Sequence, residues 1–335
     1  MTYLKAGIVG LGVGEAHIRG YQEFSNCSVR ALCDRDTAKL KETAVSYPDV
    51  SLYDSANALI DDPEINVVSI ASYDKDHFAQ VCRAISQDKH VFVEKPLCQS
   101  KAELDTIRGL LAEHPGVRLS TNLVLRASPR FMDLRSLISE GFFGEIYHLE
   151  ADYNYGRLSK LLEGWRGRQE FYSVVYGGGV HVIDLLMWLA NDRIEEVSAF
   201  GNSISSAGSG FKNKDMVVAS LKFAGGAVGK ISVNFGSVTP HFHKVSVYGT
   251  CASFENRPES GLVYRSREPE AAPEVRNTVY PGVEKHALIP SFLAAILKNE
   301  SPIVDERSVF DCMAVCFAIE EAVHNSRIVN VEYPN

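Results

Sequence analysis

The sequence predicts an α/β protein with a doubly wound parallel sheet in its first part and a run of strands without intervening helices in its second. Strands and helices alternate from the N-terminus to about residue 121, which is typical of a parallel sheet. From residue 194 to about residue 280 short strands follow one another, among them a hairpin through Gly225-Gly226. A chain of 335 residues is too long for one ordinary core, so we expect two domains, residues 1–122 and 123–335.

The composition narrows the class of protein. With 45% hydrophobic and 23% charged residues, it is that of an ordinary soluble globular chain. The net charge is −8 and no basic cluster stands out, which argues against nucleic acid and anionic membranes as partners. No apolar run approaches the roughly 18–20 residues that span a bilayer, and the first residues lack the pattern of a signal peptide. The seven cysteines have no paired spacing, so we expect reduced thiols and a cytoplasmic location.

A glycine-rich turn follows the first predicted strand, residues 6–9, and precedes a helix. The turn consists of Gly10, Leu11, Gly12, Val13 and Gly14. Strand, glycine turn and helix in this order are the context that dinucleotide binding requires, because the helix N-terminus then faces the pyrophosphate. Gly10 allows the tight turn, and Gly12 lets the backbone approach the phosphates. The third glycine, Gly14, comes one residue earlier than in the usual fingerprint, and such turns also occur for structural reasons alone.

The second predicted strand supports nucleotide binding. It covers residues 29–33 and ends at Asp34, about 20 residues after the turn, where a ribose-binding acid belongs. A carboxylate at this place accepts hydrogen bonds from the ribose hydroxyls and repels a 2′-phosphate, so we expect NAD as the cofactor. Arg35 leaves NADP open, since a guanidinium tolerates that phosphate. The alternative is that Asp34 only closes a strand in solvent.

The charged pair Glu94-Lys95 follows another buried strand, residues 91–93, and precedes Pro96. A lysine at the carboxyl end of a parallel strand lies where open α/β sheets bind their ligands. The Lys95–Pro96 bond is a candidate for a cis peptide, which would direct the lysine side chain. Taken alone, the motif is better explained by a surface lysine that closes a strand, and it is the context that favours a functional role.

The second half carries a loop at residues 156–167 that is rich in aromatic and basic side chains. The candidates on and beside it are Tyr153, Tyr155, Arg157, Trp165 and Arg166. Aromatic rings interleaved with guanidinium groups suit a polyhydroxylated or anionic substrate, although the same residues also suit a packed loop.

Three glycines at 177–179 precede His181 and Asp184 at the start of a predicted helix. The two polar residues lie three apart and share one helix face, so Asp184 is placed to orient the imidazole. A helix N-terminus disfavours imidazolium, which keeps His181 neutral and able to accept a proton. A satisfied core histidine is the alternative. His241 and His243 share one face of a later strand, but no further ligand has metal-site spacing to them, and we expect no metal.

Taken together, the chain resembles the glucose–fructose oxidoreductase / inositol dehydrogenase / rhizopine catabolism (Gfo/Idh/MocA) family. The most specific parts are Glu94-Lys95-Pro96 with His77 upstream, and the run from Gly178 to Leu186. The resemblance implies an N-terminal Rossmann domain followed by an α/β domain with a large open, mostly antiparallel sheet. It also implies a homodimer or homotetramer formed through that sheet.

By position, the resemblance makes Lys95, His181 and Asp184 the catalytic residues. It implies an NAD(P)-dependent oxidoreductase acting on a carbinol or keto carbon of a sugar, inositol or nucleotide sugar, in which Lys95 polarises the oxygen and His181 is the acid/base. An NAD(P)-responsive regulator and a redox-neutral, NAD-dependent glycoside cleavage are the alternatives. The expected cofactor residues are the glycine turn with Asp34, Arg35, Ser72, His77, Glu94 and Asn122. The expected substrate residues are Lys95, Tyr153, Tyr155, Trp165, Arg166, Tyr176 and His181.

The chain departs from the family pattern at two further places. Many members carry a carboxylate four residues before the catalytic histidine, where this chain has Gly177. Tyr176 is a candidate for its replacement. The usual Thr-Pro-Asn after the fourth strand is replaced by Ser72-Tyr73-Asp74.

Overall fold

The computed structural model of the chain describes residues 3–280 and 284–334. Two compact units make up the chain: Met1–Ala127 with Val283–Met313, and Ser128–Gly282 with Ala314–Asn335. The α/β class expected from the sequence is confirmed, because one unit holds a parallel sheet and the other a mostly antiparallel one. Among the described residues, no helix has both the length and the apolar character that crossing a membrane would require.

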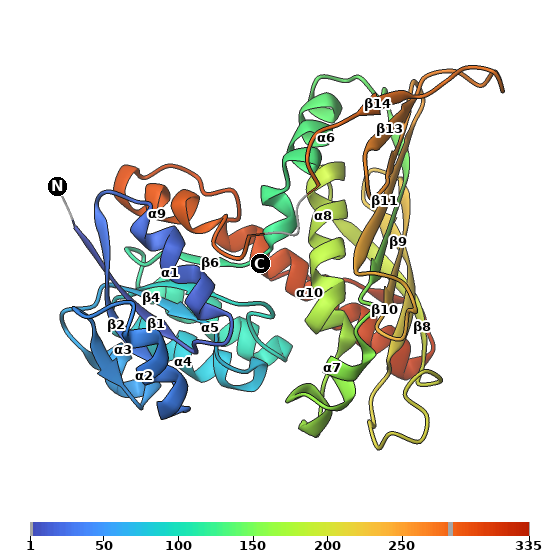
Figure 1. Ribbon diagram of the computed structural model, residues 1–335. Helices are drawn as coiled ribbons and strands as arrows, with labels where there is room; N and C mark the ends of the chain where they lie inside the picture. Colours follow the sequence, from blue (N-terminus) through green and yellow to red (C-terminus); the bar gives the residue numbers. More distant parts are fainter. Residues whose placement is uncertain (1–2, 281–283, 335) are drawn as a thin grey trace. The chain divides into compact units, whose positions relative to one another are not determined.

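The first unit is built on a six-stranded parallel sheet in the order β3-β2-β1-β4-β5-β6 (Figure 1). Its strands are β1 Leu4–Val9, β2 Cys27–Cys33, β3 Ser51–Tyr53, β4 Val67–Ile70, β5 His90–Val93 and β6 Leu119–Thr121. All four residues of β4 are buried, as expected for a strand covered on both faces. The strand order reverses between β1 and β4, and ligands of such sheets bind outside the carboxyl ends of the strands at this switch point.

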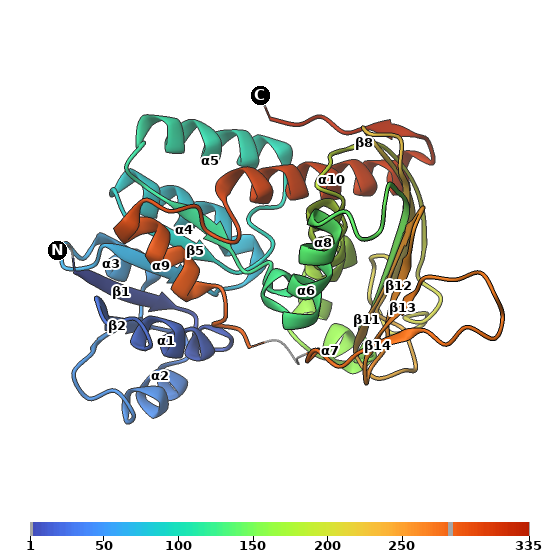
Figure 2. The ribbon, with the colours of Figure 1, turned by 90° about the horizontal axis from the view of Figure 1, so that it is seen from above.

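Helices connect these strands and cover both faces of the sheet (Figure 2). They are α1 Gly14–Gln22, α2 Thr37–Ala44, α3 Ala56–Asp61, α4 Asp74–Ser86, α5 Lys101–Glu113, the short 3₁₀ helix η1 Val124–Ala127, and α9 Ile289–Lys298. Side-chain caps fix the first residue of several of these helices. The Asp36 carboxylate accepts from the N–H groups of Ala38 and Lys39 at the start of α2. The Ser100 hydroxyl caps α5 by accepting from the Glu103 N–H at 3.2 Å.

The second unit is built on a nine-stranded sheet in the order β14-β13-β12-β11-β7-β10-β9-β8-β15. Its strands are β7 Ile146–Asn154, β8 Ile194–Asn202, β9 Met216–Phe223, β10 Val228–Asn234, β11 Phe242–Gly249, β12 Ser253–Asn256, β13 Gly261–Tyr264, β14 Glu274–Arg276 and β15 Val329–Asn330. Of the described strand pairs in it, β7 with β10 is parallel and the others are antiparallel. The predicted hairpin through Gly225-Gly226 is confirmed as β9 and β10.

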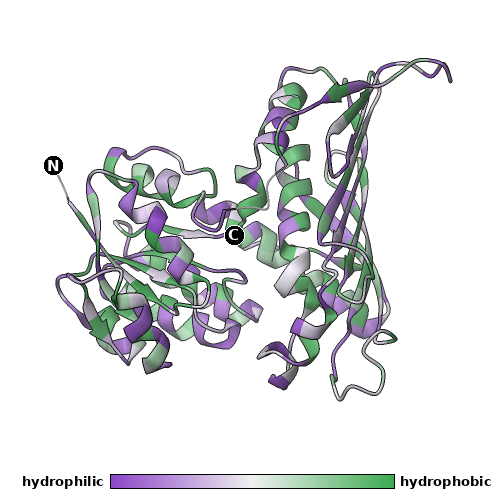
Figure 3. Cartoon of the chain, viewed as in Figure 1, coloured by the Kyte–Doolittle hydropathy of each residue, from purple (hydrophilic) through white to green (hydrophobic). Residues whose placement is uncertain are grey.

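Helices pack on one face of this sheet (Figure 1). They are α6 Pro129–Ser139, α7 Leu158–Leu162, the 3₁₀ turn η2 Arg166–Arg168, the π-helical turn η3 Val175–Gly179, α8 Val180–Ala190 and, from Ala314 on, the last helix, α10 Glu306–Asn325. Figure 3 shows the apolar character of α8, and nine of its eleven residues are buried. Along β9 the buried residues alternate with exposed ones, so the other face of the sheet is turned outward.

Candidate active site

The glycine turn lies at the switch point of the first unit, between β1 and α1. Gly10 has φ +85°, and a Cβ there would lie 2.4 Å from the Ala71 carbonyl oxygen, so only glycine fits. A Cβ at Gly12 would meet nothing within 4 Å, which leaves this side of the turn open to a ligand. A Cβ at Gly14 would approach Ile8 Cγ2 to 3.0 Å. The three glycines therefore permit the turn, the ligand's approach and the close packing of helix on strand, despite their shortened spacing.

Asp34, at the end of β2, is fixed by two backbone hydrogen bonds. Its Oδ2 accepts from the Leu11 N–H at 2.7 Å and its Oδ1 from the Asp36 N–H at 2.8 Å. An ionised carboxylate has about four acceptor positions, so these two bonds leave capacity for ribose hydroxyls. Arg35 forms an ion pair with Asp76, and its guanidinium lies 5.6 Å from the centre of the Tyr73 ring. These residues fit the adenosine half of a dinucleotide that lies with its pyrophosphate on the glycine turn.

The Lys95–Pro96 peptide, directly after β5, is cis. The Pro96 carbonyl oxygen lies 2.6 Å from Nδ1 of His77, and the Ser72 carbonyl oxygen lies 3.2 Å from Nε2 of the same ring. The Ser72 hydroxyl donates to Gln80 at 2.8 Å. The His77 ring thus lies between the Pro96 carbonyl and the segment after β4, and a neutral imidazole donates to one of these two carbonyls.

Glu94 is buried beside Lys95 and belongs to a hydrogen-bond network. Its Oε1 lies 3.3 Å from His17 Nε2 and accepts from the Asn122 amide at 2.7 Å, while its Oε2 accepts from the Lys95 N–H at 3.3 Å. An ionised carboxylate cannot donate, so His17 carries its proton on Nε2. His17 Nδ1 in turn lies 2.8 Å from the Ser69 hydroxyl. His17 of α1 and Asn122 after β6 therefore meet at this one carboxylate, and Ser69 of β4 contacts it only through His17.

The network keeps Glu94 ionised. Burial works to raise the pKa of this carboxyl, but the hydrogen bond with His17 and the charges of Lys285, His17 and Lys95 hold it well below its usual range. The Asn122 amide also donates to the Lys285 carbonyl at 2.9 Å, which ties this segment to the network. Asn122 and Glu94 thus contact each other, and the sequence pattern alone did not indicate that His17 joins them.

His181 and Asp184 lie in the first turns of α8 in the second unit, and both are buried. The His181 ring is stacked on Tyr153 with 6.2 Å between centroids and 16° between planes. The turn before α8 is η3, so the chain enters this helix through a wider turn than an α-helix has. The helical backbone already begins at Val174 and continues through η3 into α8, so His181 lies inside this helical segment and not at its N-terminus. The expectation that a helix N-terminus keeps the imidazole neutral is therefore wrong, because that effect is confined to the first turn.

Tyr153, at the end of β7, is the centre of an aromatic cluster in the second unit. Its ring centroid lies 6.0 Å from that of Tyr155, 5.2 Å from His241 and 5.1 Å from His243. Burial and Tyr155 raise the pKa of the Tyr153 hydroxyl, against the opposing charges of Arg166 and Arg157. Tyr153 therefore stays a neutral phenol beside the two guanidinium groups.

His243 is joined to the same cluster from β11. Its Nδ1 forms a short hydrogen bond with the Tyr280 hydroxyl, whose pKa burial raises to about 12. His241 Nδ1 lies 3.0 Å from the Asn154 carbonyl oxygen. Among the residues that the structure describes, no three His, Cys, Asp or Glu side chains are grouped so that they could hold a metal ion.

The space beside Gly177 is filled by Tyr172. A Cβ at Gly177 would lie 2.0 Å from the Tyr172 hydroxyl oxygen and 2.7 Å from its Cζ. The Arg166 Nε–H donates to this hydroxyl at 3.0 Å, and its guanidinium lies 4.7 Å from the centre of the Trp165 ring. Tyr176 packs instead against Phe317 of α10 at 5.7 Å. The hydroxyl nearest the bare backbone of Gly177 is therefore that of Tyr172, which the sequence did not single out.

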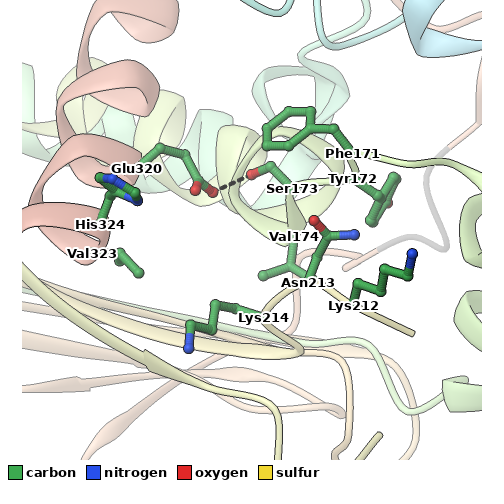
Figure 4. A pocket seen from close by; sticks show the side chains of 10 residues that line it. All are labelled: Phe171, Tyr172, Ser173, Val174, Lys212, Asn213, Lys214, Glu320, Val323 and His324. Atoms are coloured by element: carbon green, nitrogen blue, oxygen red, sulfur yellow. Dashed lines mark hydrogen bonds between the residues drawn. The ribbon is translucent and has the colours of Figure 1, made fainter. Parts of the chain in front are cut away.

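A cavity of about 340 Å³ opens beside Tyr172 within the second unit (Figure 4). It is lined by Phe171, Tyr172, Ser173, Val174, Lys212, Asn213, Lys214, Glu320, Val323 and His324. The Ser173 hydroxyl forms a short hydrogen bond with Glu320, drawn as a dashed line in Figure 4. Burial raises the pKa of the Glu320 carboxyl, and this hydrogen bond opposes the shift. Tyr172 thus lines this cavity and also accepts the hydrogen bond from Arg166.

Comparisons with known proteins agree with this description. Residues 4–123 match the model of the oxidoreductase family with the NAD-binding Rossmann fold, and residues 131–255 match the GFO/IDH/MocA C-terminal domain. Myo-inositol 2-dehydrogenase of Thermotoga maritima is 22% identical to this chain, over 98% of this chain and 99% of that protein.

Two solved structures show the same fold. A scyllo-inositol dehydrogenase from Lactobacillus casei, with bound NAD(H) and scyllo-inositol, has a TM-score of 0.82 at 19% identity, covering 98% of this chain and 99% of that one. An oxidoreductase from Agrobacterium radiobacter, in complex with NAD⁺, L-tartaric acid and magnesium, has a TM-score of 0.86 at 16% identity, with coverage of 98% and 99%. Since the two family models together match more than half of its residues, the chain belongs to the Gfo/Idh/MocA family of oxidoreductases and carries that family's NAD-binding Rossmann fold.

Proposed function

We propose that the protein transfers a hydride between NAD and a carbinol or keto carbon of a small polyhydroxylated substrate, a sugar, an inositol or a nucleotide sugar. The observation that carries this proposal is the end of the first unit's sheet. There a glycine turn open at Gly12, the doubly anchored Asp34 and the Lys95 segment follow β1, β2 and β5. NAD, when bound, supplies the nicotinamide ring that accepts or returns the hydride.

Lys95 and His181 carry the proposed chemistry. In the direction of oxidation, the Lys95 ammonium donates a hydrogen bond to the reacting oxygen and stabilises the negative charge that develops on it. His181 accepts the hydroxyl proton as the C–H electron pair leaves with its hydrogen as hydride. Asp184, one turn further along α8, orients the imidazole. In the reverse direction His181 returns the proton to the oxygen of the carbonyl substrate.

The remaining roles follow from the residues around these two groups. Glu94, His17 and Asn122 fix the backbone at Lys95, and His77 braces the peptide after it. Asp34 holds the ribose of NAD, and its repulsion of a 2′-phosphate favours NAD over NADP. In the second unit, aromatic and basic side chains bind the substrate; they are Tyr153, Tyr155, Trp165 and Arg166.

We also propose that the protein assembles as a homodimer or homotetramer through the outward face of the nine-stranded sheet. Phe200 of β8 is 72% exposed, and Val218 of the neighbouring β9 is also exposed. Light scattering after size exclusion tests the assembly, and a monomer at micromolar concentration would overturn this part. A cytoplasmic location is our proposal as well, supported by seven cysteines that have no paired spacing in the sequence.

The function is tested by calorimetry followed by a turnover screen. NAD⁺, NADH, NADP⁺ and NADPH are titrated into the purified chain, and polyols and sugars are then screened for absorbance of the reduced nicotinamide. We expect tight binding of NAD(H) and turnover that Lys95→Ala abolishes while NAD⁺ binding persists. Binding without any turnover would favour a regulator, and product formation without net NADH would favour redox-neutral cleavage. If none of the four nucleotides binds, the proposal fails.

A further inference from the structure

We propose that the substrate carries a carboxylate, and that Arg166, held in place by the Tyr172 hydroxyl, binds it. This inference rests on the proposed function and adds a substrate class to it: hydroxy acids of the sugar or cyclitol type, such as uronates, in place of neutral polyols. The observations that carry it all lie in the second unit. They concern the space at Gly177, the setting of Arg166, and the charge of the groups around Tyr153.

Tyr172 lies beside Gly177, which belongs to the π-helical turn that precedes α8. Its hydroxyl fills the volume of a side chain at Gly177, because a Cβ there would lie 2.0 Å from the Tyr172 oxygen. Gly177 precedes His181 by four residues, about one helical turn. A neutral hydroxyl therefore stands where an acidic side chain at 177 would have placed a negative charge next to the proposed acid/base. A substrate carboxylate meets no fixed anion from position 177.

The Arg166 side chain is held in an orientation that suits the binding of a planar carboxylate. Its Nε–H donates to the Tyr172 hydroxyl at 3.0 Å, and its guanidinium carbon lies 4.7 Å from the Trp165 ring centre and 5.9 Å from that of Tyr172. A guanidinium fixed through Nε and supported by two aromatic rings has lost much of its rotamer freedom. It therefore loses less conformational entropy when it binds a carboxylate through two parallel N–H bonds. Arg166 is only partly buried.

Two guanidinium groups bring positive charge to the aromatic cluster around Tyr153. Arg157 lies with its guanidinium 5.5 Å from the centre of the Tyr155 ring, and both Arg157 and Arg166 act electrostatically on Tyr153. His241 packs edge-on against Tyr153 and Tyr155. A neutral polyol is usually held by carboxylate and amide acceptors, whereas these groups offer positive charge and N–H donors. They fit a ligand that brings the negative charge itself.

The carboxylate takes no part in the bond changes. The C–H bond of the carbinol breaks with its electron pair going to NAD⁺, the hydroxyl proton goes to His181, and a C=O bond forms, so that the substrate loses two electrons and NAD⁺ gains them. The acid group remains ionised throughout. Its binding to Arg166 contributes to affinity and orientation, which places the carbinol carbon for hydride transfer.

The test uses matched pairs of sugars that differ in one carboxylate. D-Glucose is compared with D-glucuronate, and D-galactose with D-galacturonate, by NADH formation with the full chain and by calorimetry on its NADH complex. We expect kcat/KM or affinity to favour the acid by about 30-fold or more, the effect of one well-placed charged pair. Arg166→Gln should abolish this preference, chiefly through KM. Tyr172→Phe, which keeps the ring against Gly177, should reduce it by about tenfold.

Arg168→Gln is the matched control, since it removes the same charge from the same turn at an exposed position. It should leave the preference for the acid intact. Equal losses on acid and neutral substrates in Arg166→Gln would make Arg166 merely structural and overturn the inference. So would preference for the neutral member, or NAD⁺ binding without binding or turnover of any acid. Turnover of neutral polyols alone would leave the proposed function standing, whereas failure to bind any nicotinamide nucleotide would defeat both.

Discussion

Replacement of Glu94 by glutamine tests whether the buried network is held together by charge. Glu94→Gln keeps the shape but removes the negative charge and one acceptor. In either orientation of the amide, its NH₂ group would face donors: the Lys95 N–H on one side, or His17 Nε2–H and the Asn122 amide on the other. Two buried donors then face each other without an acceptor, and a hydrogen bond to a charged group is lost. We expect a loss of about 3 kcal/mol in the free energy of unfolding near pH 7.

The pH dependence has a defined sign. Because the pKa of Glu94 is held below its usual range in the folded chain, its contribution is complete above the unfolded-state pKa of about 4.3 and is lost as the pH falls toward the folded-state value. The difference between the native protein and Glu94→Gln should therefore be largest at neutral pH and shrink below about pH 4. Both proteins should still show a urea unfolding transition at these pH values, from which the free energy of unfolding is obtained.

Urea unfolding followed by circular dichroism is the appropriate assay. The two tryptophans, Trp165 and Trp188, both lie in the second unit, so their fluorescence does not report on the surroundings of Glu94. The control is Glu64→Gln, which removes an exposed carboxylate paired with Lys5 in the same unit and should cost less than about 1 kcal/mol. A Glu94→Gln protein as stable as the control at pH 7, or a difference that does not shrink in acid, would refute the reasoning.

Three further predictions concern the site itself. Gly177→Ala should lower the free energy of unfolding by about 1–3 kcal/mol, because its Cβ would collide with the Tyr172 hydroxyl. In a Tyr172→Ala background this loss of stability should vanish, and a double-mutant cycle by urea unfolding measures the difference. Asp34→Ser should weaken NAD⁺ binding at least tenfold in calorimetry and narrow the gap to NADP⁺, since the ribose loses its acceptor; unchanged affinities would contradict the role given to this carboxylate. Lys95→Met should lower kcat by at least about 100-fold with little change in NAD⁺ affinity, and a variant that retains kcat would remove Lys95 from the mechanism.

The parts of the fold that could be predicted are those encoded by contiguous residues. The glycine turn and the hairpin of β9 and β10 each occupy one short stretch, and local backbone preferences decide them. Lys95 could be located for a similar reason. The parallel-sheet rule places whatever follows β5 at the same edge as whatever follows β1, so the sequence order alone brings these segments to one side.

The groups that the sequence did not indicate depend on contacts between distant segments. His17 is separated from Glu94 by 77 residues, and its role is visible only when α1 and β5 are packed together. Tyr172 could not be predicted from the sequence for a different reason. It lies five residues before Gly177, and neither the α-helical spacing of three or four nor the strand spacing of two brings such residues together. The π-helical turn η3, which has no clear signature in the residues 175–179, begins between them.

A change in the length of η3 would move the residues before it and leave the residues after it in place. A π-helical turn contains one residue more than the α-helical path, so deleting one residue from 175–179 would restore ordinary helix while leaving α8 in frame. His181 and Asp184 would keep their places. Everything upstream would rotate by about 100° around the helix axis, and Tyr172 would leave the space beside residue 177. A single-codon deletion or insertion would thus exchange the groups of the proposed substrate site without disturbing the proposed proton-transfer residues.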